Sequence, residues 1–540
     1  MKNDPESQRL VPLLVLLILA AAALLRMQNL FSALEYDEIW TLENFSRMPV
    51  LKLFRELALP NNQPLNSLWV KFTVLSGLPL WSIRIHSLFA GLSAVGLAGF
   101  ISYHLAGRRI SAALGSMFIL ALSAPDIAYS ALARGYALQV FFLTLYGAGL
   151  TAAGFCRPQG KWKQYLPELA VAIGGAGAVL TLPTSIVYLT AITLAAYLIR
   201  SGWHLPRRSM LAVFVCGAVL TLCWCLVNYR QLNAARGWGS SIGSFADFYG
   251  FLCVTAVQVI GPVVLLIACV AFFTLPRKTL PLLLIIVLPL LSAAVTNAGP
   301  PRTYIPFGCV LAIAAGCGIS QAVERFKKNA AAVILVFCAV LCIWEYSLRQ
   351  KLWYTPDSRE IFKQTASLPY STLVVHRATN GYPVAWNNQP EIYNDFVKRL
   401  LENSTQLLMF DGPGRINGTD SKGSESVLVV RKEGSGSNIA GAHCRIYKLK
   451  KMTAAPEPGS MVFAVLRPVQ KHIYSAVIRQ LYATGVPWLK LNSWLSCPIN
   501  RPEGSYLYAL LAGVAPEKSA ISWQGLINNN GMLAFYQLAD

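Results

Sequence analysis

Negatively charged residues are scarce in this sequence. Only 25 of its 540 residues are Asp or Glu, and 13% of all residues carry a charge, whereas water-soluble domains have about 25% charged residues. This composition excludes a protein that is soluble along its whole length. Long apolar runs recur to about residue 346 and then stop, which is typical of a membrane protein with many transmembrane helices.

Cysteine patterns typical of metal sites are also absent. Most of the 12 cysteines lie in or beside apolar segments, where cysteine behaves as a small hydrophobic residue. Only Cys444 and Cys497 lie in the C-terminal part, and they could pair if that part is in an oxidising compartment. No basic, aromatic-rich module is present, which argues against nucleic acid as a partner. The net charge of +21 points first to anionic lipid headgroups or phosphates.

Basic clusters separate the apolar runs and predict the membrane topology. Loops rich in Lys and Arg stay in the cytoplasm, so the spans between two such clusters come in pairs. About eleven helices satisfy this rule, and an odd number places the N-terminus in the cytoplasm and the C-terminal part outside. The expected spans are 10–30, 85–106, 111–125, 135–155, 165–181, 183–200, 209–228, 249–275, 279–297, 303–322 and 330–346.

The fold class is therefore a polytopic α-helical membrane protein over residues 1–346, with a soluble C-terminal domain over residues 347–540. That domain is expected to be α/β or α+β, because strand-like runs alternate with helical patterns at 359–366 and 472–483. The strand-like runs are 372–376, 406–410, 427–431, 445–449, 461–466 and 534–538.

The first polar loop, residues 32–84, contains five of the twelve Asp and Glu residues of the membrane part. A carboxylate pair at the water edge of a membrane suits acid–base chemistry on a substrate held there. An isolated Asp-Glu pair is more often an ordinary pair of solvated surface residues. Within the loop, residues 65–78 are expected to form a helix lying in the interface rather than a span. The acids of the loop are Glu35, Asp37, Glu38, Glu43 and Glu56.

Three arginines stand at the expected outer ends of helices, against the inside bias of positive charge. Arg84, Arg134 and Arg302 could reach water with their charged ends or pair with the loop acids. Several cations facing the acidic loop also suggest a site for an anionic headgroup. Arginine suits phosphate, because its planar group donates two hydrogen bonds at once.

Four short motifs resemble those of a known family. Tyr36-Asp37-Glu38 follows the first span, and Asn61-Asn62-Gln63-Pro64-Leu65 lies in the first loop. Residues 129–138 read Tyr-Ser-Ala-Leu-Ala-Arg-Gly-Tyr-Ala-Leu, and Pro301-Arg302-Thr303-Tyr304 opens a late span. In order and on one side of the membrane, they resemble the motifs of membrane-embedded GT-C glycosyltransferases. The similar group is family 39-like, related to protein O-mannosyltransferases and the aminoarabinose transferase of lipid A.

The sequence departs from this family pattern at three places. Gln63 replaces a His, Gly135 replaces a Pro, and Ala131-Leu132 stands where many relatives have a polar-acidic pair. The exchange of His for Gln weakens any role of position 63 as an acid or metal ligand. The second carboxylate of the family is missing or supplied elsewhere, for example by Asp126.

The resemblance implies transfer of a sugar from a polyprenyl-phosphate donor to a lipid, glycan or protein outside the cytoplasm. It implies a single displacement that inverts the anomeric carbon, in a multi-pass protein of the bacterial inner (plasma) membrane. Asp37 would be the catalytic base, and Glu38 would orient arginines or a divalent metal ion. The expected substrate-binding residues are Arg84, Arg134, Arg302, Tyr136 and Gln63.

Two other functions stay open. The chain could be a transporter or flippase of a lipid-linked glycan, or an inactive relative whose soluble domain binds a partner. Transporters need ionisable groups or broken helices near the middle of the membrane. In this sequence the acids cluster on one side and the expected spans are almost free of charge, which favours the enzyme.

Overall fold

The computed structural model divides the chain into two compact units, which are described separately. The first comprises Met1–Phe31, Trp40–Gln350 and Leu481–Pro498, and the second comprises Ser32–Ile39, Lys351–Gln480 and Ile499–Asp540. The residues that the structure describes are 5–57, 61–155, 165–199, 208–236, 240–241, 245–295, 297–299, 301–325 and 328–353, together with the strands of the C-terminal part.

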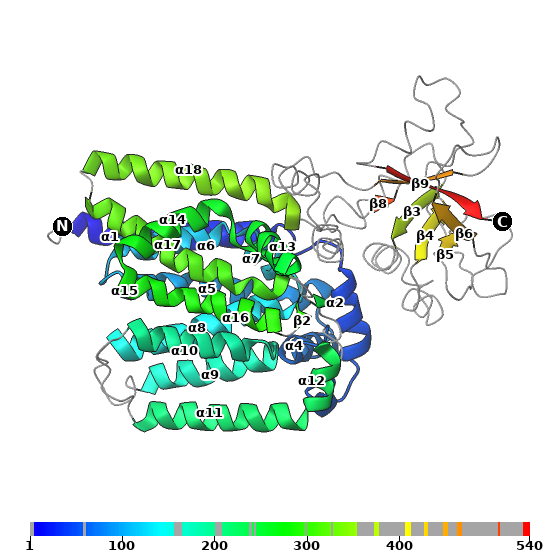
Figure 1. Ribbon diagram of the computed structural model, residues 1–540, viewed down its shortest axis with the longest axis horizontal. Helices are drawn as coiled ribbons and strands as arrows, with labels where there is room; N and C mark the ends of the chain where they lie inside the picture. Colours follow the sequence, from blue (N-terminus) through cyan, green and yellow to red (C-terminus); the bar gives the residue numbers. More distant parts are fainter. Residues whose placement is uncertain are drawn as a thin grey trace, which may run out of the picture. The chain divides into compact units, whose positions relative to one another are not determined.

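The part before residue 354 is helical, and its long helices run side by side (Figure 1). The α-helices are α1 (Pro5–Met27), α2 (Tyr36–Trp40), α3 (Val50–Leu53), α4 (Pro64–Leu75), α5 (Ile85–Leu105), α6 (Ile110–Ala121), α7 (Ala124–Ser130), α8 (Gly135–Phe155), α9 (Leu166–Thr181), α10 (Ser185–Ile199), α11 (Arg208–Val227), α12 (Tyr229–Arg236), α13 (Phe245–Thr255), α14 (Pro262–Thr274), α15 (Pro276–Thr279), α16 (Leu284–Val295), α17 (Pro306–Arg325) and α18 (Lys328–Trp353).

Short elements connect these helices. Two are π-helices, η1 (Thr41–Phe45) and η4 (Ala256–Ile260). Three are 3-10 helices, η2 (Leu80–Arg84), η5 (Leu280–Leu283) and η6 (Pro301–Tyr304). The short strands β1 (Ser240–Ser241) and β2 (Asn297–Ala298) pair antiparallel.

Helix α17 forms the buried centre of the helical unit. All of its residues from 306 to 320 are buried, and it packs against α5, α6 and α14. Small residues permit these close contacts. A Cβ atom added at Gly316 would lie 2.5 Å from the Ala112 carbonyl oxygen, and one at Gly318 would lie 2.9 Å from that of Ile267.

Six of the described helical segments are long and apolar enough to cross a membrane. The bent pair α6 and α7 would make a seventh span, and the count of about eleven spans stays a prediction. The six segments are Leu10–Met27, Leu80–Leu105, Gly135–Phe155, Met210–Val227, Pro276–Val295 and Pro301–Arg325.

Two expected spans are broken rather than continuous. The span expected over 111–125 ends as α6, and α7 then departs at an angle of 65°. Pro125 explains this break, because proline has no N–H to continue the helix and disfavours a helical residue before it. The span expected over 249–275 breaks at Gly261, whose φ of +81° favours glycine, and Pro262 then opens α14.

The C-terminal unit contains a seven-stranded mixed sheet, with the order β7-β9-β6-β5-β4-β3-β8 (Figure 1). Strands β4 and β5 are parallel, and the other neighbours are antiparallel. The six strands expected from the sequence are present, within two residues of their expected bounds, whereas β8 was not expected. The strands are β3 (Thr372–His376), β4 (Gln406–Asp411), β5 (Ser426–Val429), β6 (Tyr447–Lys451), β7 (Val462–Leu466), β8 (Tyr506–Leu507) and β9 (Leu533–Ala539).

Several predictions for the C-terminal part lie outside the described residues. These are the helices at 359–366 and 472–483, and the pairing of Cys444 with Cys497. The boundary between residues 346 and 347 stays a prediction as well.

Candidate functional site

The Asp-Glu pair lies in the first turn of α2 and is buried. Asp37 is 6% exposed and Glu38 is fully covered, so the pair is not part of a solvated surface. Glu38 Oε2 accepts a hydrogen bond of 2.9 Å from the backbone N–H of Glu35, the residue that precedes the helix. This is one half of a capping box. Glu38 therefore fixes the start of the helix that carries Asp37.

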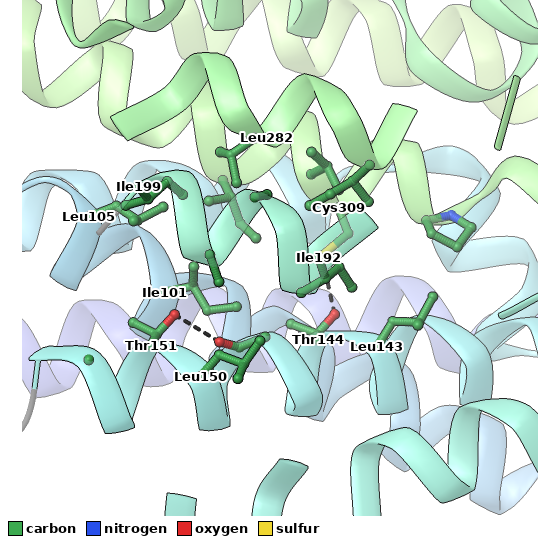
Figure 2. Close-up of a pocket in the computed structure, with 18 of the residues that line it drawn as sticks. Ile101, Leu105, Leu143, Thr144, Leu150, Thr151, Ile192, Ile199, Leu282 and Cys309 are labelled. Carbon is green, nitrogen blue, oxygen red and sulfur yellow. Dashed lines mark hydrogen bonds between the residues drawn. The ribbon is translucent and has the colours of Figure 1, made fainter. Parts of the chain in front are cut away.

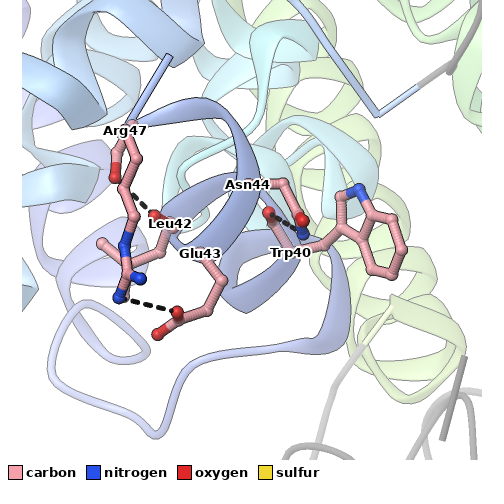
Figure 3. A network of polar contacts seen from close by, with 6 residues as sticks. Trp40, Leu42, Glu43, Asn44 and Arg47 are labelled. Atoms are coloured by element: carbon pink, nitrogen blue, oxygen red, sulfur yellow. Dashed lines mark hydrogen bonds and ion pairs between the residues drawn. The ribbon is translucent and has the colours of Figure 1, made fainter. Parts of the chain in front are cut away.

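The π-helix η1 continues α2, and one of the loop acids, Glu43, forms an ion pair within this region. Glu43 Oε2 pairs with Arg47 Nη2 at 3.1 Å, and Asn44 Nδ2 donates to the Trp40 carbonyl oxygen at 3.0 Å (Figure 3). The Arg47 side chain is 76% exposed, so this ion pair adds little stability. Among the described residues, no group of three or more His, Cys, Asp or Glu side chains could hold a metal ion.

Two of the family-like motifs meet at a single peptide group, the one that joins Arg134 to Gly135. Its N–H donates to Gln63 Oε1, 72 residues away in the sequence. Its carbonyl oxygen accepts a hydrogen bond of 3.4 Å from Ser87 Oγ. The residue before α4 and a side chain of α5 thus hold both ends of the peptide that carries Arg134. Both departures from the family pattern, Gln63 and Gly135, take part in this contact.

The ring of Tyr136 brings two of the predicted phosphate-binding arginines together. The Cζ atoms of Arg134 and Arg302 lie 5.7 Å and 5.9 Å from the ring centroid, within the range of cation–π attraction. Arg302 Nε also donates to the Tyr136 hydroxyl at 2.9 Å, and the ring of Tyr129 packs edge-on at 4.8 Å. An anion beside this ring would interact favourably with both guanidinium groups.

Arg84 has structural contacts that the sequence did not predict. It is fully buried, and its Nη1 donates to the carbonyl oxygens of Asn29 and Leu30 at 3.0 Å each. These contacts tie the segment after α1 to the start of α5. Phosphate binding by Arg84 stays a prediction.

Arg26 and Asp126 stabilise the break between α6 and α7. Arg26 is fully buried and donates to the carbonyl oxygens of Leu120 and Ala121 at 3.3 Å and 3.2 Å. These carbonyls belong to the last turn of α6, where carbonyl oxygens have no N–H partner within the helix. Asp126 accepts a hydrogen bond from Ser123 Oγ at the start of α7. A catalytic role of Asp126 stays a prediction.

An apolar cavity of about 80 Å³ lies between α5, α8, α10, α16 and α17 (Figure 2). Its few polar side chains are turned to their own helices: Thr144 Oγ1 donates to the Val140 carbonyl at 2.6 Å, and Thr151 Oγ1 to that of Gly147 at 2.8 Å. The remaining lining is aliphatic, aromatic or cysteine. The cavity therefore suits a hydrocarbon chain rather than a polar ligand.

Sequence reasoning missed Ser87, which donates to the Arg134 carbonyl, and His86 and Asn66, which continue this chain of contacts. No short motif identifies them, because each is an ordinary polar residue on a helix. Only their pairing across α4, α5 and the segment before α8 makes them part of the site.

No protein-family profile and no curated protein matches the chain, but four chains of known structure do. The structure of ArnT from Cupriavidus metallidurans in the apo state has 18% identity and a TM-score of 0.44, and covers 69% of this chain and 68% of its own. ArnT bound to undecaprenyl phosphate has 17% identity and a TM-score of 0.41, with the same coverage. An Archaeoglobus fulgidus oligosaccharyltransferase in complex with Zn and sulfate has 12% identity and a TM-score of 0.36, over 64% of this chain and 56% of its own. ArnT, the aminoarabinose transferase of lipid A, and the oligosaccharyltransferase are both GT-C membrane glycosyltransferases, the class that the sequence motifs resemble.

Proposed function

We propose that the chain is a membrane-embedded glycosyltransferase. It would move a sugar from a polyprenyl-phosphate donor to a lipid, glycan or protein acceptor outside the cytoplasm. One observation carries the proposal: three motifs that are far apart in the sequence meet in the helical unit. Gln63 binds the peptide between Arg134 and Gly135, and the neighbouring Tyr136 binds Arg302.

The two arginines at Tyr136 suit the leaving group of such a reaction. When the bond from the sugar to the phosphate breaks, negative charge increases on the phosphate oxygens. Arg134 and Arg302 would stabilise that charge, since guanidinium groups donate charge-assisted hydrogen bonds to phosphate. The peptide contacts of Gln63 and Ser87 hold the backbone of Arg134 in place before the donor binds, so little reorganisation is needed.

Asp37 is proposed as the base that takes the proton of the acceptor. Adjacent side chains on a helix point about 100° apart, so Asp37 faces a different direction from Glu38, which caps α2. Glu38 thus serves the helix start, and we assign proton transfer to Asp37. A well-placed base contributes ~10²–10⁴-fold to the rate.

The apolar cavity is proposed to take part of the polyprenyl chain. Pro306 and Cys309, which line it, begin α17, and Arg302 lies just before this helix in η6. A lipid whose phosphate is at Arg302 could therefore reach the cavity along α17. We further propose that the protein lies in the bacterial inner membrane with its C-terminal domain outside the cytoplasm.

The test is to incubate purified protein with a panel of polyprenyl-phosphate sugars and candidate acceptors, and to search for the product by mass spectrometry. Covalent transfer by the wild-type protein, and its loss in Arg302→Gln, is expected. Absence of transfer from every donor would reject the proposal and favour an inactive relative.

A transporter of a lipid-linked glycan is a second candidate, supported by the broken helices and by buried charges. The helices break after α6 and at Gly261, and Arg349 pairs with Glu345 at 3.7 Å, with side chains 4% and 3% exposed. Buried ion pairs and interrupted helices are typical of transporters. Movement of intact donor lipid across proteoliposomes, without covalent product, would favour this function.

A further inference from the structure

Two carboxamide groups are buried at the start of α4, and each has an amide nitrogen without a partner. Gln63 and Asn66 are both fully covered. Within the described part of the chain, Gln63 Nε2 and Asn66 Nδ2 have no hydrogen-bond partner. Gln63 is the residue before α4 and Asn66 lies in the first turn of that helix, so both donors are at the start of α4. Buried donors are rarely left unpaired, which indicates an occupant.

The neighbours of each amide fix the direction of its nitrogen. Gln63 Oε1 accepts from the Gly135 N–H, so its NH2 group must point elsewhere. Asn66 Oδ1 lies 2.9 Å from His86 Nε2, which donates to it in the tautomer that is protonated there. His86 Nε2 lies 3.3 Å from Ser87 Oγ. A chain of contacts thus runs from Asn66 back to the Arg134 peptide, and both amides are held before any ligand binds.

Asn62 provides the contrast within the same motif. Its Nδ2 donates to the carbonyl oxygens of Leu53 and Glu56, at 2.8 Å and 2.5 Å. Its Oδ1 accepts from Ser67 Oγ at 2.9 Å. All hydrogen-bonding groups of this amide are used inside the protein, which gives Asn62 a structural role. The free donors of Gln63 and Asn66 have no such explanation.

We propose that Gln63 and Asn66 form a donor subsite for hydroxyl oxygens of the transferred sugar. This inference rests on the proposed function and deepens it. Uncharged N–H donors suit uncharged hydroxyl oxygens, whereas the two arginines at Tyr136 suit the phosphate. Gln63 also binds the peptide of Arg134, so the subsite adjoins the predicted phosphate site. Both amides are fully covered in this structure, so the groups that cover them must move aside before a sugar binds, while the hydrogen bonds that hold the amides stay in place.

Gly135 leaves room for the Gln63 side chain and provides the N–H that it binds. A Cβ atom at position 135 would lie 2.9 Å from Gln63 Oε1 and 2.7 Å from Thr181 Cγ2. The proline of the related pattern would also lack the N–H that Gln63 binds. The hydrogen bond between Gln63 and Gly135 therefore requires both residues in which this chain departs from the related pattern.

The test compares two ligands on the full-length purified protein, undecaprenyl phosphate alone and a panel of undecaprenyl-phosphate monosaccharides. Asn66→Asp and Gln63→Glu keep the oxygen that contacts His86 or Gly135 and replace the NH2 group with a second carboxyl oxygen, which cannot donate when the carboxylate is ionised. Asn66→Leu removes the donor without adding charge. Gln139→Glu is the matched control, because this buried amide already donates to Ser185 Oγ at 3.0 Å. Thermal unfolding verifies that each variant is folded.

The affinity of the folded subsite variants for the best-bound glycosylated lipid is expected to fall about tenfold. In Asn66→Leu the affinity for bare undecaprenyl phosphate should stay within about twofold, whereas a carboxylate at position 63 or 66 would also repel the phosphate. The control should change neither affinity. Equal losses for both ligands in Asn66→Leu, or no loss for either, would overturn the inference; the latter would assign the donors to an enclosed water. The binding measurements contain no acceptor, so they test the subsite alone. The proposed function is tested by the transfer assay, and it fails if the wild-type protein transfers no sugar.

Discussion

A single methyl group at Gly135 should disturb the peptide that carries Arg134. The added atom would lie 2.7 Å from Thr181 Cγ2 and 2.9 Å from Gln63 Oε1, closer than normal contact. Overpacking of this kind destabilises by about 1–3 kcal/mol, so Gly135→Ala should lower the free energy of unfolding by that amount. Gln63→Ala should also destabilise by about 1–3 kcal/mol, because the buried Gly135 N–H loses its acceptor.

The double variant separates this contact from general damage. With Gln63 shortened, the methyl group at position 135 loses one of its two clashes, so the double variant should be more stable than the sum of the single effects by about 1 kcal/mol. Denaturant titration in detergent micelles measures these differences. Gly147→Ala on the same helix is the control, since its added Cβ would lie 3.5 Å from Ile101 Cδ1, an ordinary contact. Additive effects, or a Gly135→Ala variant as stable as Gly147→Ala, would refute the reasoning.

Four further predictions concern the reaction, the fold and the topology. Asp37→Asn should reduce the rate of transfer by ~10²-fold or more and leave the affinity for the donor unchanged; a folded variant with near wild-type rate would end the assignment of Asp37 as base. Arg302→Gln should weaken undecaprenyl phosphate binding about tenfold, and Tyr136→Phe, which removes only the hydroxyl that Arg302 binds, should weaken it less; unchanged affinity in Arg302→Gln would leave the arginine a structural role. Arg26→Met should lower the free energy of unfolding by about 1–3 kcal/mol, because the α6 carbonyls lose their donor; a denaturant titration that matches wild type would contradict this. A reporter that is active only outside the cytoplasm, fused after Asp540, should be active, whereas activity of a cytoplasmic reporter would show that the predicted number of spans is wrong by one.

Local sequence patterns were sufficient to predict several features of this protein. Long apolar runs must fold as helices in a membrane, because each backbone group needs a partner inside the segment. Short runs with β-branched and aromatic residues predicted β3 and β9, and the density of acids identified the loop that contains Asp37. Each of these features depends on about twenty neighbouring residues, so no tertiary information was needed.

The tertiary structure decided which of these residues meet, and what each does there. Gln63 and Gly135 appear in the sequence as two unrelated departures from a pattern, but they are hydrogen-bonded across 72 residues. Arg84 and Arg302 look alike as cations at helix ends, yet one caps backbone carbonyls and the other binds Tyr136. Asn66 carries no motif at all. Contacts between distant segments depend on how the helices pack, and short-range periodicity does not encode them.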